Sequence, residues 1–375
     1  MKEYLTGRAL RIAILLPSLA AGGAEHVALM LAREFMAVGH EVELILVQAD
    51  GALMGEVPAG VKVVDLGCTR FRYAVFPLVS RLRRNPPDVL LASMWPLTGI
   101  AAVANRIAGG RSTVVTSEHN DLRLTPAVTT ADRRLLRLLG RRIYGLARAQ
   151  VVVSRGLVEC MGEIADIPPD RLTVIYNPLR PISDAPLPDD PLTRWWRGGG
   201  AALIGVGSLK PAKGFDLLID AVALLRGSGC DPRLLILGEG PERAALEARI
   251  EGLGLHDHVR LAGFRADPYP YMRAADLFVL SSRWEGLGNV IAEALACGTN
   301  VVSTDCPSGP AELLEHGRYG RLVPPGDPQA LADGIRAALA QPLDPGPLIA
   351  RAAEFTPARA AAAYLDAMGL APAHH

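Results

Sequence analysis

Two glutamates flank a glycine-bearing turn in the stretch SSRWEGLGNVIAEALACG, residues 281–298. Glu285 stands just before Gly286-Leu287-Gly288, and Glu293 lies four residues past Asn289, about one turn along a helix that begins there. The backbone amides at the start of such a helix attract a phosphate. A carboxylate, by contrast, readily accepts hydrogen bonds from two neighbouring hydroxyl groups. A ligand that suits both has phosphate in its middle and hydroxyl-rich parts on either side, which describes a nucleotide sugar.

The two glutamates then have separate roles. Glu293 binds the ribose, Glu285 binds the sugar, and the amides between Gly286 and Asn289 receive a phosphate. The alternative is a pair of glutamates on the solvent face of a helix. Taken alone the pair favours that alternative, and a second glycine-rich segment shifts the balance toward a site.

That second segment, GVGSLKPAKG (Gly205–Gly214), follows an apolar run and precedes a helical pattern. Its spacing matches neither the G-x-G-x-x-G fingerprint of dinucleotide sites nor the P-loop. The chain contains four lysines against 35 arginines, and two of the four, Lys210 and Lys213, lie in this segment. Lysine offers a compact positive charge that suits a phosphate. The segment therefore predicts a phosphate site, with two solvated loop lysines as the alternative.

The stretch from Arg123 to Arg155 is basic and amphipathic. It holds eight arginines and one acid, Asp132, with leucines interleaved among them. Such a stretch can lie on anionic lipid or bind a lipid diphosphate. The alternative is an ordinary domain helix with an arginine-rich outer face. The residues that carry the lipid hypothesis are Arg133, Arg134, Arg137, Arg141 and Arg142.

Length and composition describe the chain that must position these residues. With 375 residues, half of them hydrophobic, the chain is long enough for two globular domains. Residues 1–180 carry 22 Lys+Arg against 16 Asp+Glu, a balance of +6, and the remainder carries 17 against 23, or −6. A basic half beside an acidic half indicates that the first half meets something anionic. Complementary faces of two docked domains are the alternative explanation.

Several classes of protein are disfavoured by composition. No run of about 18 apolar residues indicates a membrane span, and we read no export signal near the first residue, so we expect a cytoplasmic protein. The five cysteines are scattered without C-x-x-C spacing, which argues against structural zinc. Aromatic residues are only 5%, and no nucleic-acid recognition motif is present.

The order of apolar runs predicts an α/β fold with doubly wound parallel sheets. In the first half, strands are expected at 11–16, 41–47, 89–92, 114–117 and 151–154, with a helix after the first strand that ends at Gly39. A linker rich in proline and glycine follows at 178–200. The rhythm then restarts with strands at 202–206, 234–237, 259–262, 277–280 and 300–303, and with helices at 216–226, 242–252, 270–274 and 328–340. A helical tail covers 355–368.

These motifs together resemble a known family. The Glu285-x7-Glu293 pair, the Gly207-x5-Lys213-Gly214 loop, the GEGPE turn at Gly238–Glu242 and the Gly263-Phe264 pair are similar to the large retaining glycosyltransferase family 4, over nearly the whole chain. The resemblance implies the GT-B fold, in which two Rossmann-like domains face each other across a cleft. It implies an acceptor-side domain at 1–180, with a C-terminal helix at about 355–375 packing back on it, and a nucleotide-sugar domain at 181–354.

The resemblance also implies site residues. Lys213, Glu285 and His119 are expected to act in catalysis, His119 from a loop, SEHN, that is similar to the family's histidine-bearing loop; a plain loop histidine is the alternative. The GGAE turn at Gly22 and Gly23 is expected to face the donor phosphates. The full expected donor set is Gly22, Gly23, Gly207, Ser208, Lys210, Lys213, Gly240, Phe264, Arg265, Glu285, Gly286, Leu287, Gly288, Asn289 and Glu293.

The expected reaction follows from the same resemblance. A sugar is transferred with retention from a UDP-hexose or UDP-N-acetylhexosamine, and the leaving phosphate takes the acceptor's proton. The IYNP and DCPSGPAELL segments resemble the branch that extends polyprenyl-diphosphate-linked glycans, so we expect a lipid-linked acceptor and peripheral binding to the inner face of the cell membrane. No metal or other cofactor is expected, since no D-x-D pair occurs.

One departure from the family bears on activity. The family usually has an arginine five residues before the loop lysine, where this chain has Ser208. The diphosphate loses a cation there unless Lys210 replaces it. A catalytically weak donor-binding protein is therefore one alternative function. A sugar-nucleotide epimerase, which shares the two-domain architecture and binds the same donor, is the other.

Overall fold

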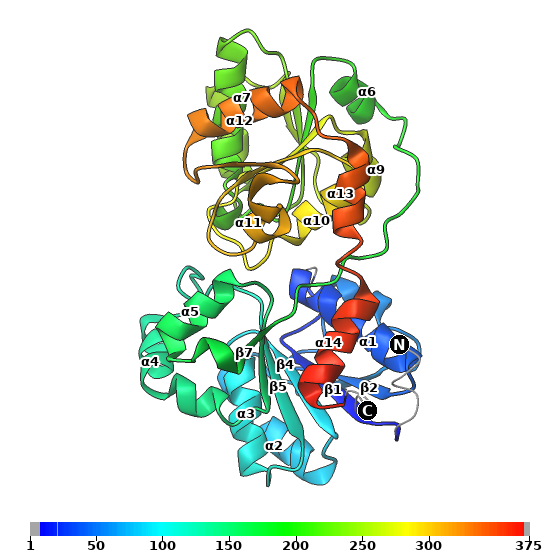
Figure 1. Cartoon of the computed structure of the whole chain (residues 1–375), viewed down its shortest axis with the longest axis vertical. Coiled ribbons are helices and arrows are strands. Elements are labelled where there is room, and N and C mark those ends of the chain that lie inside the picture. The colour runs from blue at the N-terminus through cyan, green and yellow to red at the C-terminus, as the bar shows by residue number, and fades with distance from the viewer. Residues whose placement is uncertain (1–7, 21, 371–375) are drawn as a thin grey trace. The chain divides into compact units, whose positions relative to one another are not determined.

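The computed structural model describes residues 8–20 and 22–370, which form two compact units (Figure 1). Of these, residues 8–20, 22–180 and 355–370 belong to the first unit, and Pro181–Glu354 make up the second. Each unit is a parallel sheet covered by helices. The predicted α/β class with two doubly wound sheets is confirmed.

The first unit contains a seven-stranded parallel sheet in the order β3-β2-β1-β4-β5-β6-β7. The strands are β1 (Arg11–Leu16), β2 (Glu41–Leu46), β3 (Lys62–Asp65), β4 (Val89–Ser93), β5 (Thr113–Glu118), β6 (Ala149–Val152) and β7 (Leu172–Val174). The helices are α1 (Gly23–Ala37), α2 (Val75–Arg84), α3 (Leu97–Ile107), α4 (Thr130–Tyr144), α5 (Gly156–Ala165) and α14 (Pro357–Met368), with short 3₁₀ turns η2 (Ala52–Glu56), η3 (Phe71–Tyr73) and η4 (Pro169–Arg171).

The apolar run at the start of the chain forms the centre of this sheet. Ile14 of β1 pairs with Leu44 of β2 on one side and with Leu91 of β4 on the other. Five of the six residues of β1 are buried, as expected for a strand covered on both faces. The C-terminal helix α14 lies beside α1 (Figure 1), and its residues Tyr364 and Leu365 belong to the same hydrophobic core as β1.

The second unit contains a six-stranded parallel sheet in the order β10-β9-β8-β11-β12-β13. The strands are β8 (Ala202–Val206), β9 (Arg233–Leu237), β10 (Val259–Leu261), β11 (Leu277–Leu280), β12 (Val301–Thr304) and β13 (Arg321–Val323). The helices are α6 (Pro191–Arg197), α7 (Phe215–Gly227), α8 (Arg243–Gly252), α9 (Tyr269–Ala274), α10 (Asn289–Ala296), α11 (Pro310–Leu313), α12 (Pro328–Ala340) and α13 (Pro345–Ala352), with 3₁₀ turns η5 (Pro211–Lys213) and η6 (Glu315–Gly317).

The linker is shorter than the composition indicates. We expected an irregular connection over residues 178–200, but α6 forms inside it. Asp190 caps this helix by accepting a hydrogen bond from the Thr193 amide at 2.8 Å. Trp196 is fully buried and donates its indole hydrogen to the carbonyl of Leu203 in β8 at 3.0 Å. The proline-rich composition concealed a capped helix that is anchored to the second sheet.

Candidate active site

The loop lysine and the first glutamate of the pair meet in the second unit. Lys213 ends η5, which follows β8, and Glu285 follows β11. The Lys213 ammonium donates to both carboxylate oxygens of Glu285, at 2.7 and 2.9 Å, and the Ser282 hydroxyl donates to one of them at 2.6 Å. The side chain of Glu285 is 9% exposed and that of Lys213 is 22% exposed. A largely buried ion pair therefore lies where β8 and β11, adjacent strands of the sheet, end.

A close backbone approach brings these two loops together. An ideal β-carbon on Gly214, whose φ is +60°, would lie 2.1 Å from the carbonyl oxygen of Ser281. Only glycine permits that approach. The loops are also joined by the Ser281 hydroxyl, which donates to the Lys213 carbonyl at 2.9 Å, and by the Arg283 amide, which donates to the Ala212 carbonyl at 2.7 Å. The position of Lys213 against Glu285 is thus set by the backbone.

The glycine turn of the E-x7-E stretch begins a helix as predicted. Gly288, with φ of +86°, is the N-cap of α10, and Glu293 lies on that helix. Glu285 is 9% exposed and Glu293 is 7% exposed. The alternative of two glutamates on a solvent face is therefore wrong for both. A buried carboxylate requires a partner or a ligand, because the loss of hydration is otherwise unfavourable.

The glycine turns after β8, β9 and β10 are bonded to one another. The Leu209 amide donates to the Glu239 carbonyl at 2.9 Å, and the Gly238 amide donates to the Gly263 carbonyl at 2.9 Å. An ideal β-carbon on Gly240 would lie 2.4 Å from the Leu209 carbonyl oxygen, and one on Gly207 would touch the aliphatic part of Lys213. The predicted donor glycines that follow β8 and β9 therefore lie together at the carboxyl ends of the strands.

Other predicted donor residues also follow the carboxyl ends of the strands, but within the described residues their side chains make no hydrogen bond to the Lys213–Glu285 ion pair. Phe264 is 57% exposed, and Arg265 donates to the Phe264 carbonyl at 3.3 Å. Lys210 is exposed, and its amide donates to the Ser208 carbonyl at 2.8 Å. In the described ranges 8–20 and 22–370, none of these side chains bonds to Lys213 or Glu285. Their roles stay predictions.

His119 follows β5 in the first unit and is not a plain surface residue. It is 8% exposed, and its Nε2 lies 3.1 Å from the hydroxyl of Ser117. Burial lowers the pKa of His119 to about 4, because the charged imidazolium is poorly solvated there. The ring is therefore neutral at pH 7. Its Nδ1 is buried and makes no hydrogen bond within the described part of the chain.

The glycine turn at the start of α1 also holds an acid, Glu25, for which the sequence pattern predicts no role. Gly22 is the N-cap of α1, and Gly23 is its first residue. Glu25 is 8% exposed, and its carboxylate would lie 2.2 Å from an ideal β-carbon on Gly22. A phosphate at this turn has to share the helix N-terminus with the Glu25 carboxylate.

The basic segment forms α4, a helix that packs on the first unit through a narrow stripe of buried residues. Leu136, Gly140 and Tyr144 are buried, whereas Leu138 is 78% exposed. All five arginines of the predicted lipid-binding set lie exposed on the helix, and Arg141 makes an exposed contact of 3.6 Å with Asp166. Apolar and basic side chains thus share one solvent-facing surface. None of the helices in the described ranges is long and apolar enough to span a bilayer.

Glu118 is a buried group that the sequence reasoning missed. It is 2% exposed and accepts hydrogen bonds from the Trp95 amide at 3.0 Å, the Thr98 hydroxyl at 2.6 Å and the Tyr144 hydroxyl at 2.5 Å. Burial raises the pKa of this carboxyl, and the three hydrogen bonds oppose that shift. Because Tyr144 ends α4, Glu118 ties this helix to the end of β5. The sequence feature that could have identified Glu118 is its position directly before His119, the candidate site histidine.

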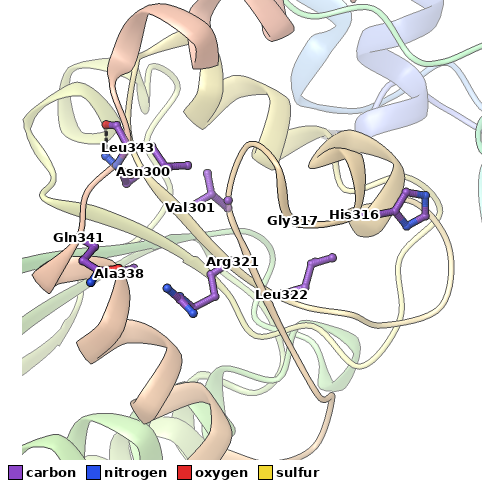
Figure 2. A pocket seen from close by; sticks show the side chains of 10 residues that line it. Asn300, Val301, His316, Gly317, Arg321, Leu322, Ala338, Gln341 and Leu343 are labelled. Carbon is purple, nitrogen blue, oxygen red and sulfur yellow. Dashed lines mark hydrogen bonds between the residues drawn. The ribbon is translucent and has the colours of Figure 1, made fainter.

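A cavity of about 330 Å³ lies elsewhere in the second unit (Figure 2). Asn300, which precedes β12, lines it and is hydrogen bonded to Leu343. Lys213 and Glu285 lie at the opposite, carboxyl ends of the parallel strands. The cavity contains none of the predicted site residues. Separately, no group of three or more His, Cys, Asp or Glu residues within the described ranges is arranged to hold a metal ion.

Comparison with known families matches both halves of the chain. The model described as Glycosyltransferase Family 4 matches residues 21–181, and the model described as Glycosyl transferases group 1 matches residues 200–341. The first match covers most of the unit that holds His119 and α4. The second covers the loops that carry Lys213, Glu285 and Glu293.

Individual relatives match over different lengths. An N-acetylgalactosamine-N,N'-diacetylbacillosaminyl-diphospho-undecaprenol 4-alpha-N-acetylgalactosaminyltransferase of Campylobacter jejuni is 29% identical over 346 residues, which is 88% of this chain and 90% of that protein. The lipopolysaccharide core biosynthesis glycosyltransferase LpsE of Rhizobium meliloti is 41% identical over 138 residues, 37% of this chain and 39% of that protein. The crystal structure of Anabaena Alr3699/HepE with UDP and glucose superposes with a TM-score of 0.76 at 25% identity, over 96% of this chain and 99% of that one.

Proposed function

This chain belongs to the GT-B glycosyltransferases of family 4, and we propose that it transfers a hexose or N-acetylhexosamine from a UDP-linked donor to a lipid-linked glycan with retention. The observation that carries the proposal is the ion pair between Lys213 and Glu285 at the carboxyl ends of β8 and β11. This ion pair places a cation that can bind phosphate beside a carboxylate that can accept hydrogen bonds from sugar hydroxyls. Family membership gives no support to the sugar-nucleotide epimerase considered above.

Lys213 has the hydrogen-bonding capacity that the reaction requires. An ammonium group carries three donors, so it can bond to a donor phosphate while it still contacts Glu285. As the sugar leaves the diphosphate, negative charge grows on the phosphate oxygens, and a fixed cation there stabilises the transition state. The amides before α10 add partial positive charge. We propose that these groups act without a metal ion and that Glu285 orients the sugar.

The UDP donor is proposed from the relatives. HepE binds UDP and glucose in its crystal structure, and the Campylobacter relative is named for transfer of N-acetylgalactosamine. Thermal unfolding with UDP-, GDP- and ADP-sugars tests the choice. A ligand at 100 times its Kd stabilises by about 2.7 kcal/mol, so UDP-sugars are expected to raise Tm while the other two series do not. Stabilisation by a GDP- or ADP-sugar alone would overturn the UDP assignment.

Replacing Glu293 tests the ribose contact. Glu293→Ala is expected to weaken donor binding by roughly 1.5–3 kcal/mol, or about 10- to 150-fold in Kd, because it removes charge-assisted hydrogen bonds from a buried position. The measurement is titration calorimetry with UDP and UDP-sugar. Glu251→Ala, at an exposed position of α8, is the control and should leave Kd unchanged. An unchanged Kd in a folded Glu293→Ala protein would remove this residue from the site.

Ser208 allows a gain-of-function test. If the site merely lacks one cation, Ser208→Arg should raise donor affinity or kcat by roughly tenfold or more, the effect of one charge-assisted contact. The Lys210 side chain is exposed and, among the described residues, makes no hydrogen bond to the side chain of Lys213 or Glu285. Steady-state transfer assays compare the variant with the parent. A loss of activity would instead indicate that a neighbouring group already fills this space.

The lipid-linked acceptor rests on α4 together with the acceptor named for the Campylobacter relative. The exposed leucines and arginines of α4 suit the interface of an anionic bilayer. Phe76 is a further exposed apolar side chain of the first unit, at 82%, and its helix α2 packs against α3, as α4 does. We propose that this face of the first unit meets the membrane that carries the acceptor.

A further inference from the structure

A buried chain of hydrogen bonds links the C-terminal helix to His119. The Tyr364 hydroxyl on α14 lies 2.7 Å from the Ser117 hydroxyl, and Ser117 Oγ lies 3.1 Å from His119 Nε2. Tyr364 is 1% exposed and Ser117 is fully buried. The two hydroxyls come from residues 247 positions apart in the chain. At the end of this chain of bonds, His119 Nδ1 is buried and makes no hydrogen bond to any described residue.

The direction of these hydrogen bonds follows from the number of donors. Burial raises the pKa of Tyr364 to about 12, so the phenol keeps its proton at neutral pH. Ser117 is the one partner of this hydroxyl among the described residues, and buried O–H groups are rarely left unpaired. Tyr364 therefore donates to Ser117. Within the described part of the chain, the Ser117 proton then has one acceptor at hydrogen-bond distance, His119 Nε2.

The opposite tautomer is unfavourable in this surrounding. If His119 carried its proton on Nε2, both Tyr364 and His119 would donate to Ser117, and the serine proton would have no acceptor. Ser117 is fully buried, so water does not replace that acceptor. Neutral imidazole has one N–H. On Nδ1 it is the one donor in this chain of bonds left without an acceptor among the described residues, and a bound ligand can supply that acceptor.

We propose that Tyr364 is a positioning residue that acts through Ser117 to hold His119 in the tautomer protonated at Nδ1, so that this N–H is presented to an oxygen of a bound substrate. The presentation to substrate rests on the proposed function, whereas control of the tautomer does not. Because the pKa of His119 is about 4, the ring is neutral from roughly pH 5 upward. The arrangement is thus expected to persist across the neutral range, and activity should show no titration of His119 there.

Nitrogen NMR of the full-length protein labelled with ¹⁵N-histidine tests the tautomer. The chain has eight histidines, and the spectrum of His119→Gln identifies the signals of His119. At pH 7 the parent is expected to show a protonated Nδ1 and an unprotonated Nε2. Ser117→Ala and Tyr364→Phe should each shift His119 toward a mixture of tautomers. A proton on Nε2 in the parent, or an unchanged tautomer in both variants, would overturn the proposal.

A double-mutant cycle separates positioning from a merely structural effect. Tyr364→Phe is expected to lower kcat/KM about threefold to tenfold, the effect of one neutral hydrogen bond. In a His119→Ala background the same substitution should lower kcat/KM no further, because Tyr364 is proposed to act only through the His119 imidazole, which this background lacks. Tyr144→Phe, which removes a similarly buried hydroxyl from the same unit, is the matched control and should act multiplicatively with His119→Ala.

The outcomes distinguish this proposal from the proposed function. If the effects of Tyr364→Phe and His119→Ala on kcat/KM multiply fully in the double variant, Tyr364 acts on stability alone and the positioning role is wrong. If His119→Ala leaves transfer unchanged while the NMR tautomer responds to Tyr364→Phe, presentation of Nδ1–H to the substrate is overturned and tautomer control stands. Thermal unfolding of each variant verifies that the folded protein is being compared.

Discussion

Replacing Lys213 with alanine is expected to lower kcat by roughly 100- to 1,000-fold. This is the usual effect of removing one preorganised group that stabilises charge in a transition state. Lys213 is suited to that role because its ammonium is held 2.7 Å from the Glu285 carboxylate by two loops that are bonded to each other. Single-turnover transfer from the UDP-sugar measures the chemical step directly. Parent activity is expected to survive excess EDTA, as the metal-free proposal requires.

The substitution also leaves Glu285 without its cation, so stability has to be separated from catalysis. An unpaired buried charge destabilises a protein, and Lys213→Ala alone is expected to lower Tm. The double variant Lys213→Ala/Glu285→Gln removes the unpaired charge and should recover stability but not activity. Recovery of both would show that Lys213 only neutralises Glu285. A Lys213→Ala protein with parental kcat would place the diphosphate elsewhere.

Removing the arginines of α4 is expected to abolish membrane binding. Each basic residue near an anionic bilayer contributes about 1 kcal/mol, within a Debye length of about 8–10 Å. The parent should therefore sediment with anionic liposomes at low ionic strength and be released by roughly 0.5 M salt. The variant, with glutamine at Arg133, Arg134, Arg137, Arg141 and Arg142, should remain in the supernatant. Donor affinity should be unchanged, because the loops with Lys213 and Glu285 lie in the other unit.

A control with the same change in charge makes this test specific. Five exposed arginines of the second unit, replaced by glutamine, should leave sedimentation unaltered: Arg194, Arg197, Arg226, Arg318 and Arg336. Leu138→Ser tests the apolar contribution separately, since this side chain is 78% exposed. Equal sedimentation of parent and α4 variant would make the helix an ordinary solvated element. Absence of sedimentation by the parent at any salt would weaken the lipid-linked acceptor.

The sequence alone determined most elements of the fold. Strands covered on both faces appear in the sequence as short apolar runs. The strands expected on this basis at 202–206 and 277–280 coincide with β8 and β11. The glycine turns, the helix start at Asn289 and the position of His119 after a strand were also predictable, because each depends on local residue types. The strands that were missed, β3, β7 and β13, lie at sheet edges and bury few side chains, so their apolar pattern is weak.

Only the tertiary structure decided which side chains meet and which are buried. Lys213 and Glu285 are 72 residues apart, and their contact depends on β8 pairing with β11 and on the backbone approach at Gly214. Taken alone, Glu293 fits either a binding site or a solvent-facing helix position in the sequence, and the packing of α10 buries it. The hydrogen bond from Tyr364 to Ser117 depends on where α14 packs in the first unit. No local pattern encodes these contacts, because each is set by strand order and helix packing across long stretches of chain.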